Sequence, residues 1–326
     1  MARLLVTGGA GFIGSHFIRW QQKNHPEDEL LCLDKLTYAG SLEALEEPRA
    51  KGLTFVRGDI CDRTLVLGLL EEFRPQYVVN FAAESHVDRS IAEPGVFVRT
   101  NVEGVQVLLD GCRAAGVERF HQVSTDEVYG QLPLDRYDLR FAEEDPIRPS
   151  SPYSAAKAAG DLLVLAASRT YGQPVTISRG SNTYGSWQHP EKLIPRMILL
   201  ALEDRPLPVY GQGINVRDWL YVEDHCAAID AILRRGRSGQ VYNVGASCEK
   251  TNLEVVGAIL KALNKADSLI TFVADRPGHD LRYALDWSKM GKELGWAPAM
   301  DFNRGLEETV RWYLSHRSWA TWQAER

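Results

Sequence analysis

Two pairs of side chains in the middle of the sequence have the types and spacing of a site that moves protons. Tyr153 and Lys157 are four residues apart, so on a helix the phenol and the ammonium lie on one face. A cation close to a phenol lowers its pKa, and such a tyrosine can take a proton from a substrate alcohol. Asp126 and Glu127 are adjacent carboxylates and follow Thr125, whose hydroxyl can hydrogen-bond a reacting oxygen. The two pairs predict oxidation of an alcohol next to a general acid and a general base.

Either pair alone also fits a structural role. A tyrosine and a lysine at this spacing occur on exposed helix faces, and adjacent carboxylates occur in solvated turns, where Asp126 would cap the following segment. Their place in the chain separates these alternatives. Asp126 and Glu127 follow a strand-like segment, 120–124, and the Tyr/Lys pair begins the next helical pattern.

The first half of the chain alternates short apolar segments with amphipathic ones. This alternation predicts an α/β fold, a doubly wound parallel sheet with helices on both faces. The expected strands cover residues 4–7, 30–34, 54–57, 77–81, 120–124 and 175–179, and the expected helices cover 13–23, 65–73, 102–115 and 153–171. Because the carboxyl ends of parallel strands face the ligand crevice, the Asp126/Glu127 pair is expected there.

A glycine-rich turn follows the first expected strand. Gly8, Gly11 and Gly14 allow a tight turn, a close approach of pyrophosphate and close packing of helix on strand. Asp34 comes twenty residues after Gly14, where a carboxylate accepts both ribose hydroxyls and repels a 2′-phosphate. The neighbouring Lys35 favours NADP instead, because a basic residue can accommodate the 2′-phosphate. The pattern predicts a Rossmann-type dinucleotide site and favours NAD over NADP.

The later sequence has a different rhythm, with dense prolines and turn residues after about residue 180. A strand pattern at 241–244 and helical patterns at 224–234, 253–263 and 305–314 follow. We expect a cofactor lobe over residues 1–180, to which later segments near 215–245 return. Residues 181–326 are expected to form mainly a smaller, mixed α/β substrate-binding lobe.

Composition excludes several classes of protein. A formal net charge of −6 argues against nucleic-acid binding, which needs an excess of cations. No apolar run reaches the roughly 18 residues of a membrane span. The sequence has no cluster of His and Cys that suggests a metal site, so no bound metal ion is expected. The five cysteines have no paired spacing, which favours the cytoplasm; they are Cys32, Cys61, Cys112, Cys226 and Cys248.

These motifs resemble the extended short-chain dehydrogenases/reductases, and within them the NAD-dependent sugar-nucleotide epimerase/dehydratase family. Besides the glycine loop and the Tyr153/Lys157 pair, the similarity covers nearly the whole chain in six segments. They are Ala-Ala-Glu-Ser-His-Val-Asp at 82–88, Ser-Thr-Asp-Glu-Val-Tyr-Gly at 124–130, Ser-Asn-Thr-Tyr-Gly at 181–185, Pro-Glu-Lys-Leu-Ile-Pro at 190–195, Asn-Val-Arg-Asp-Trp at 215–219 and Asp-Arg-Pro-Gly-His-Asp at 275–280. The Thr-Asp-Glu triplet points to the 4,6-dehydratases of this family, because the epimerases lack the acid pair.

The resemblance implies a reaction in which each of these residues has a role. Tyr153 takes the proton of the carbon 4 hydroxyl while hydride passes to NAD. Glu127 then removes the carbon 5 proton, and Asp126 protonates the leaving carbon 6 hydroxyl. Hydride returns to carbon 6, and the product is a 4-keto-6-deoxy sugar nucleotide. The implied substrate is dTDP-glucose or a related nucleotide sugar. The scheme needs Glu127 ionised and Asp126 protonated, as two coupled carboxyls allow.

The resemblance also implies the ligand contacts. NAD would contact Gly8, Gly11, Phe12, Ile13, Gly14, Asp34, Lys35, Leu36, Thr37, Asp59, Ile60, Phe81, Ala82, Ala83, Thr100, Tyr153, Lys157 and Thr183. The substrate would contact Ser85, Thr125, Asn182, Lys192, Leu193, Pro208, Tyr210, Arg217, Asn252, Arg276 and His279. Arg217 and Lys192 suit the diphosphate. A homodimer is implied as well, packed through the helices expected at 102–115 and 153–171.

Two departures and several alternatives remain at this point. Thr183 stands where the family pattern Ser-Asn-Asn-Tyr-Gly has its second Asn, and Ser186-Trp187 replaces a Pro-aromatic pair. Within the enzyme class, the rivals are a dehydratase of UDP- or GDP-linked sugars, a sugar-nucleotide 4-epimerase and a UDP-glucuronate decarboxylase. A rival from another class is an NAD-binding regulator without catalysis. It predicts loss of the Tyr/Lys or the acid pair, and all four residues are present.

Overall fold

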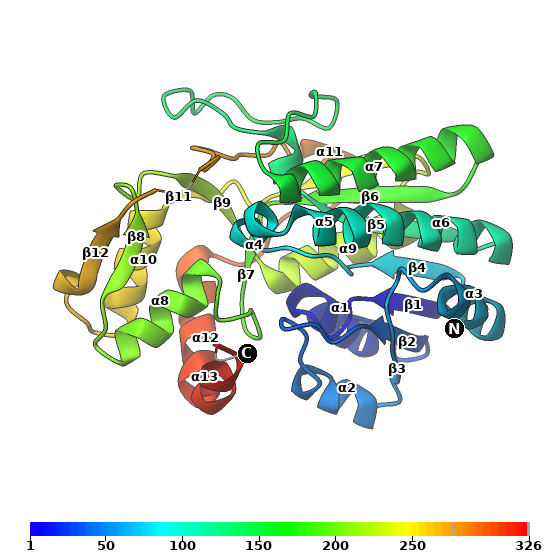
Figure 1. Ribbon diagram of the computed structural model, residues 1–326, viewed down its shortest axis with the longest axis horizontal. Helices are drawn as coiled ribbons and strands as arrows, with labels where there is room; N and C mark the ends of the chain where they lie inside the picture. The colour runs from blue at the N-terminus through cyan, green and yellow to red at the C-terminus, as the bar shows by residue number, and fades with distance from the viewer. Residues whose placement is uncertain (276, 325–326) are drawn as a thin grey trace.

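Seven parallel strands form the central sheet, in the order β10-β6-β5-β4-β1-β2-β3 (Figure 1). The structure, a computed structural model, describes residues 1–275 and 277–324. The strands of this sheet are β1 (Arg3–Thr7), β2 (Glu29–Asp34), β3 (Thr54–Arg57), β4 (Tyr77–Asn80), β5 (Arg119–Thr125), β6 (Val175–Gly180) and β10 (Gln240–Val244). The order reverses between β1 and β4, and in open α/β sheets such a switch point is where ligands bind.

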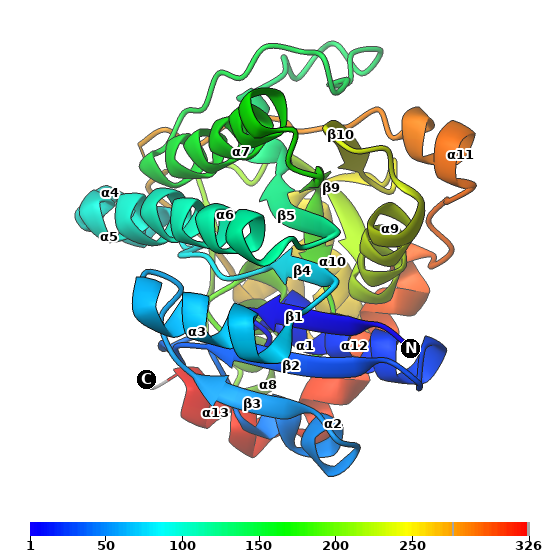
Figure 2. The same ribbon diagram turned by 90° about the vertical axis from the view of Figure 1, so that its right-hand side faces the viewer.

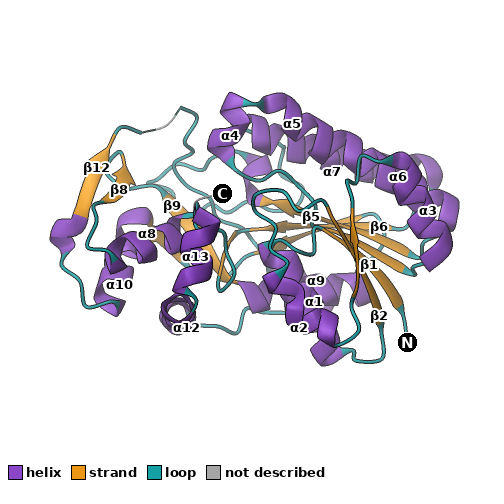
Figure 3. Cartoon of the chain, turned by 60° about the horizontal axis from the view of Figure 1, so that its bottom comes forward, coloured by secondary structure: helices purple, strands orange, loops and turns teal. Residues whose placement is uncertain are grey.

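Helices cover both faces of this sheet, so its strands are buried on two sides (Figures 1 and 3). One face carries α3 (Arg63–Phe73), α6 (Gly104–Ala115) and α7 (Pro152–Tyr171), and the other carries α1 (Phe12–Asn24) and α9 (Val222–Arg235). Alternate residues of one strand enter different cores: Leu4 packs with Phe17 of α1, and Leu5 packs with Leu108 of α6. The predicted α/β class with a doubly wound parallel sheet is therefore confirmed.

The long helix α7 begins at a strong start signal. Ser151 accepts a hydrogen bond from the backbone N–H of Ser154, and the hydroxyl of Ser154 accepts one from the N–H of Ser151, which is a capping box. Pro152 occupies the first helical position, where no N–H is needed. This start places Tyr153 in the first turn, next to the end of β5.

A second group of elements packs at the carboxyl end of the sheet (Figures 1 and 2). It contains the sheet β11-β9-β7 and the pair β12-β8, with β7–β9 parallel and β9–β11 antiparallel. Its strands are β7 (Asn182–Tyr184), β8 (Leu207–Tyr210), β9 (Val216–Tyr221), β11 (Glu249–Thr251) and β12 (Ile270–Val273). Its helices are α8 (Leu193–Leu202), α10 (Asn252–Ala262), α12 (Phe302–Ser315) and α13 (Arg317–Ala324). They share a core that includes Ile198, Val256 and Leu306.

The later sequence also returns to the central sheet. β10 pairs with β6 in parallel, with Gln240 opposite Thr176, and α9 packs against α1. β9, which precedes α9, stays in the three-stranded sheet. Shorter helices complete the chain: α2 (Glu46–Ala50), α4 (Val87–Ala92), α5 (Pro94–Val98) and α11 (Ser288–Leu294).

Candidate active site

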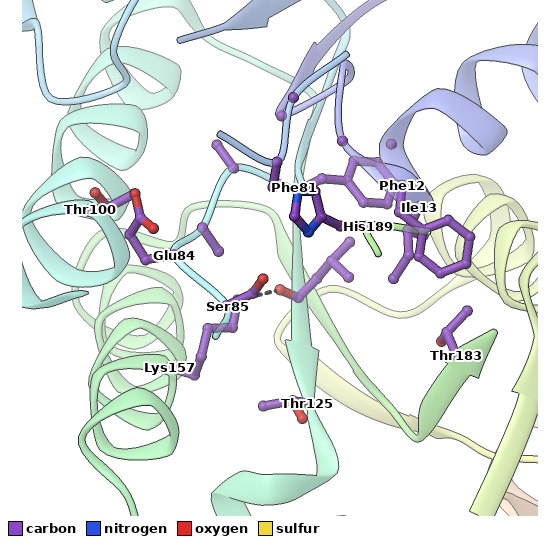
Figure 4. Close-up of a pocket in the computed structure, with 18 of the residues that line it drawn as sticks. Phe12, Ile13, Phe81, Glu84, Ser85, Thr100, Thr125, Lys157, Thr183 and His189 are labelled. Carbon is purple, nitrogen blue, oxygen red and sulfur yellow. Dashed lines mark hydrogen bonds between the residues drawn. The ribbon is translucent and has the colours of Figure 1, made fainter. Parts of the chain in front are cut away.

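A cavity of about 330 Å³ lies along the carboxyl ends of the central strands, between the two groups of elements. All five residues expected to do chemistry line it: Thr125, Asp126, Glu127, Tyr153 and Lys157. Every expected dinucleotide contact except Leu36 also lines it. Figure 4 shows Thr100, Glu84 and Lys157 on one side of this pocket and Phe12, Ile13 and Thr183 on the other. The structure thus brings the two predicted motifs into one site.

The glycine loop has the close packing that a pyrophosphate cradle requires. Gly8 has φ +70°, and a Cβ there would lie 2.4 Å from the backbone nitrogen of Ala82. A Cβ on Gly14 would lie 2.3 Å from the carbonyl oxygen of Gly8. Gly11 precedes α1 without a side-chain cap, so the first N–H groups of this helix are left for a ligand's phosphates. The loop fits a dinucleotide.

The end of β2 is arranged for a ribose with free hydroxyls. Asp34 accepts hydrogen bonds from the backbone N–H groups of Ala10, at 2.9 Å, and Leu36, at 2.8 Å. Burial nevertheless raises the pKa of this carboxyl above its usual value. Lys35 points elsewhere, because its ammonium pairs with Asp59 at 2.8 Å. Lys35, the basic side chain that could have accommodated a 2′-phosphate, is therefore already paired with Asp59.

Leu36 is the one expected dinucleotide contact that does not line the cavity. Its backbone takes the left-handed conformation, with φ +57°, which turns its N–H toward Asp34. Its contribution is to hold the carboxylate.

The acid pair lies where β5 ends and the turn η3 (Asp126–Tyr129) begins. Thr125 accepts from the N–H of Glu127, at 3.3 Å, and its hydroxyl donates to Oδ1 of Asp126, at 3.2 Å. Asp126 is 2% exposed, and its Oδ2 has no hydrogen-bond partner. Burial, together with the charges of Glu127 and Asp218, raises the pKa of Asp126 well above its usual value. The geometry therefore favours the protonated acid that the elimination scheme needs.

Tyr153 and Lys157 reach the cavity from the first turns of α7. Lys157 donates from Nζ to the carbonyl oxygen of Val123, 2.6 Å away, and burial lowers its pKa to about 8. The pKa of Tyr153 is raised, chiefly by burial and next by the charge of Glu127. The prediction that the pKa of this phenol is lowered is therefore wrong for the protein alone, because burial and the nearby carboxylates disfavour the phenolate.

The expected substrate contacts divide into two groups. Ser85, Thr125, Asn182 and Lys192 line the cavity, and Nζ of Lys192 donates to the carbonyl oxygen of Ser85, at 3.0 Å. The structure does not bring the remaining described ones to the cavity: Leu193, Pro208, Tyr210, Arg217, Asn252 and His279. Arg276 lies outside the described residues.

The residues outside the cavity belong mainly to the second group of elements. The ring of Tyr210, at the end of β8, packs edge-on against His279, with centroids 6.0 Å apart. Arg217 is buried on β9, and its guanidinium donates to the carbonyl oxygens of Val216 and Asp280. The guanidinium of Arg217, which was expected to bind a diphosphate, thus binds the protein's own backbone in this structure.

The cavity also contains residues that the sequence reasoning did not assign. They are Ser124, Glu84, Ser181, Gln188, His189, Glu191 and His225, among others. Glu84 and Glu191 stood inside segments quoted for the resemblance, without a role. Tyr38 donates to Oε1 of Glu191, at 3.1 Å, which joins the loop after β2 to the segment before α8. His225 gave no signal, because it lies within an ordinary helical pattern.

The described part of the chain holds no group of three or more His, Cys, Asp or Glu side chains that could bind a metal ion. None of its helices combines the length and apolar character needed to cross a membrane.

Comparisons with known proteins agree with this geometry. The family model described as GDP-mannose 4,6 dehydratase matches residues 5–309. A dTDP-glucose 4,6-dehydratase of Haemophilus influenzae is 48% identical, over 98% of this chain and 99% of its own. The crystal structure of DesIV, a dTDP-glucose 4,6-dehydratase from Streptomyces venezuelae with NAD bound, superposes with a TM-score of 0.94 at 48% identity, over 98% of this chain and 99% of that one. A UDP-glucose 4-epimerase of Thermus thermophilus shares 32% identity with a TM-score of 0.88, over 96% and 99%.

The fold and the site define a sugar-nucleotide enzyme built on the short-chain dehydrogenase fold, and the chain belongs to the GDP-mannose 4,6 dehydratase family. Within that family it is similar over its full length to proteins named dTDP-glucose 4,6-dehydratase. The resemblance seen in the sequence motifs is confirmed.

Proposed function

We propose that this chain is an NAD-dependent dTDP-glucose 4,6-dehydratase, a hydro-lyase that forms dTDP-4-keto-6-deoxy-glucose. One observation carries the proposal: the buried Asp126 and its neighbour Glu127 lie in the same cavity as Tyr153 and a dinucleotide cradle. An enzyme that only oxidises and reduces carbon 4 has no use for a second acid and base. A dehydratase needs both.

The cofactor is NAD. The glycine loop leaves the N-terminus of α1 to the pyrophosphate, and Asp34 suits free ribose hydroxyls. When bound, NAD would accept a hydride from carbon 4 of the sugar and return it to carbon 6. Thr125, Tyr153 and Lys157, which line the cavity, are the residues that would hold its nicotinamide ring.

Tyr153 is the base for the carbon 4 hydroxyl. Burial favours its neutral form in the protein alone, so the positive charges gathered in the loaded site must stabilise the phenolate. The ammonium of Lys157 is one such charge, held in place by the carbonyl oxygen of Val123. Thr125 hydrogen-bonds the oxygen at carbon 4 as it becomes a ketone.

Glu127 and Asp126 carry out the elimination. The 4-ketone acidifies the proton on carbon 5, and Glu127 removes it. Asp126 gives its proton to the carbon 6 hydroxyl, so that the carbon–oxygen bond breaks and water leaves. Glu127 then returns a proton to carbon 5. Asp126 suits its part because burial and the charges of Glu127 and Asp218 raise its pKa and favour the protonated carboxyl.

The choice of dTDP-glucose is supported by the relatives, which are named for that substrate at 47–48% identity over nearly the whole chain. In the cavity, Lys192 supplies the cation suited to the substrate's diphosphate. The residues of the second group, among them Tyr210, Asn252 and His279, would complete the nucleotide grip. A UDP- or GDP-linked sugar is the closest alternative.

A panel of nucleotide sugars tests the proposal. The purified protein should convert dTDP-glucose, in preference to UDP- and GDP-sugars, to a product lighter by one water, without net NADH. Preferred turnover of another nucleotide would correct the substrate. Recovery of a dTDP-galactose epimer with no loss of water would overturn the dehydratase assignment.

The proposed working unit is a homodimer formed through α6 and α7 and their neighbours. Apolar side chains stand exposed on this side, including Leu162 of α7, 55% exposed, and Val98 of α5, also 55%. Large exposed apolar groups gathered on one side are typical of an interface. Leu162→Glu combined with Val98→Glu should convert a dimer to a monomer by light scattering, whereas a wild-type protein of monomer mass would refute the proposal.

Two further assignments are part of this proposal. Residues 1–180, with segments near 215–245 that include α9 and β10, form the cofactor lobe, and residues 181–326 supply most of the substrate lobe. The protein acts in the cytoplasm, and its five thiols, three of them buried and none in a disulfide, suit a reducing compartment.

A further inference from the structure

Thr183 and His225 form a partly buried hydrogen-bonded contact at the wall of the cavity. Thr183 lies on β7, and its Oγ1 is 2.8 Å from Nδ1 of His225 and 3.2 Å from the carbonyl oxygen of Ser181. His225 is on α9 and only 2% exposed. Both residues line the cavity, and Figure 4 shows Thr183 across the pocket from Lys157.

This part of the wall belongs to the reacting end of a bound dinucleotide. Asp34 and Asp59 mark the adenosine end and the glycine loop marks the pyrophosphate, so the nicotinamide must lie toward Tyr153. Gly180 pairs with Thr125 where β6 and β5 end, and Ser181 and Thr183 follow it directly, so these cavity residues belong to that same end. The carboxamide of the nicotinamide ring is the polar group that a side chain there can recognise.

Counting protons sets the direction of the hydrogen bonds at Thr183. Burial lowers the pKa of His225 to about 4, so the imidazole is neutral and carries one N–H. Nε2 is buried without a partner, and a buried N–H without an acceptor is rarer in proteins than an unused lone pair. The proton is therefore on Nδ1, which donates to Oγ1 of Thr183. The single hydroxyl proton of Thr183 then goes to the carbonyl oxygen of Ser181.

The imidazole cannot easily leave this arrangement. A Cβ on Gly180 would lie 2.6 Å from Cε1 of His225, so the ring fills the space that this glycine leaves at the end of β6. The ring also lies on α9, which is packed against α1. The orientation of the Thr183 hydroxyl is therefore set by the fold before any ligand arrives.

We propose that Thr183 is a pure hydrogen-bond acceptor for the N–H of the nicotinamide carboxamide, and that His225 is the positioning residue that enforces this polarity. The inference rests on the proposed function, because it assumes that the dinucleotide is NAD. It adds the positioning residue His225 and the direction of the hydrogen bond to the proposed function. Thr183 accepts this bond, and the N–H of the carboxamide donates it. The His225 imidazole acts through Thr183 and does not touch the cofactor.

Binding of cofactor analogues tests the polarity without any turnover. The probes are NADH and reduced 3-acetylpyridine adenine dinucleotide, in which a methyl group replaces the carboxamide NH₂. Titration of the full chain, freed of its cofactor, should show NADH bound about three- to tenfold more tightly, the worth of one hydrogen bond. Thr183→Val should bring the two affinities together, and Thr183→Ser, which keeps the hydroxyl, should preserve the difference.

The role of His225 has its own pair of variants. His225→Leu removes the donor at Nδ1 and frees the Thr183 hydroxyl to turn, so the preference for NADH should fall. In His225→Asn the side-chain N–H occupies roughly the position of Nδ1, so the preference should be restored. This rescue would not follow if His225 only filled space, because leucine fills that space better than asparagine.

The contrary outcomes are distinct. A wild-type protein that binds both probes equally, or Thr183→Val with the full preference, would overturn the role of Thr183. His225→Leu with the full preference would overturn the role of His225. A wild-type protein that binds neither probe would instead contradict the proposed cofactor itself.

Discussion

Lys157 donates a hydrogen bond from Nζ to the carbonyl oxygen of Val123, 2.6 Å away, and so joins helix α7 to strand β5 inside the site. One helical turn further on, Asp161 pairs with the buried Arg179 of β6 at 2.9 Å. Two bonds thus fix α7 across neighbouring strands. The phenol of Tyr153 keeps a set distance from Thr125 and from the acid pair that follows it.

The first prediction separates the roles of the two carboxylates. Glu127→Gln should abolish exchange of the carbon 5 proton with solvent and reduce turnover by about 10²- to 10⁴-fold, because an amide cannot act as a base. Asp126→Asn should retain oxidation at carbon 4 and mainly slow the loss of water. Deuterium incorporation at carbon 5, measured by mass spectrometry in D₂O, distinguishes the two. Full activity in both variants would remove them from the mechanism.

The second prediction concerns stability against pH. The pKa of Asp126 is raised in the folded protein, whereas the unfolded chain has the ordinary value of 3.8. As the pH rises above 3.8, the unfolded chain releases a proton that the folded protein holds, and stability is lost. Asp126→Asn removes this cost. We expect it to unfold at a higher temperature than the wild type at pH 8, with the difference vanishing near pH 4.

An exposed carboxylate supplies the control for that measurement. Asp138 pairs with Arg136 through two hydrogen bonds, which lower its pKa to about 2. The sign of its contribution is opposite, so Asp138→Asn should bring no gain at pH 8. If Asp126→Asn were less stable than the wild type at pH 8, burial of an acid would not be the dominant cost at this position.

The third prediction concerns the choice between the two nicotinamide cofactors. Asp34→Ser removes the charge that repels a 2′-phosphate, so affinity for NADP relative to NAD should rise by about 10- to 100-fold. Lys35→Ala should leave the preference unchanged, because its ammonium pairs with Asp59. Fluorescence titration with NADH and NADPH measures both ratios. A higher NAD preference in Lys35→Ala, caused by weaker binding of NADPH, would show that the ion pair with Asp59 breaks on binding and that Lys35 reaches the 2′-phosphate.

The fourth prediction compares two glycines in helices. A methyl group on Gly14 of α1 would collide with the backbone oxygen of Gly8 at 2.3 Å, and the strain of such overpacking is about 1–3 kcal/mol. Gly14→Ala should therefore be less stable and bind NADH more weakly. Gly68 of α3 has nothing within 4 Å of its virtual Cβ, so Gly68→Ala should gain up to about 1 kcal/mol. Urea unfolding and NADH titration of both variants check this.

The first half of the fold could be read from the sequence because its strands are buried on both faces. In Tyr77–Asn80, for example, Val78 and Val79 point to opposite faces and both are buried, and the neighbouring helices have clear amphipathic patterns. The helix expected from residue 102 begins at Gly104, after a π-helical turn over Arg99–Glu103. Local periodicity does not indicate such a turn.

The second half was less predictable because its strands are short. β7 and β11 have three residues each and exist through pairing with β9, which lies far from both along the chain. No local pattern specifies a strand of that length. The same limit applies to the site. The dinucleotide residues follow predictable strands, whereas His225 reaches the cavity only because α9 packs against α1.

The pairing of β10 with β6 has a consequence for how the chain is made. β6 ends at Gly180, and its partner begins only at Gln240, after β7, β8 and β9 have been synthesised. Until then the growing chain carries an unpaired strand edge with adjacent apolar surface, which is the kind of surface that aggregates. During synthesis on the ribosome, a chaperone can therefore bind the unpaired edge of β6. This edge is covered once the residues up to Val244 have emerged and β10 can pair with it.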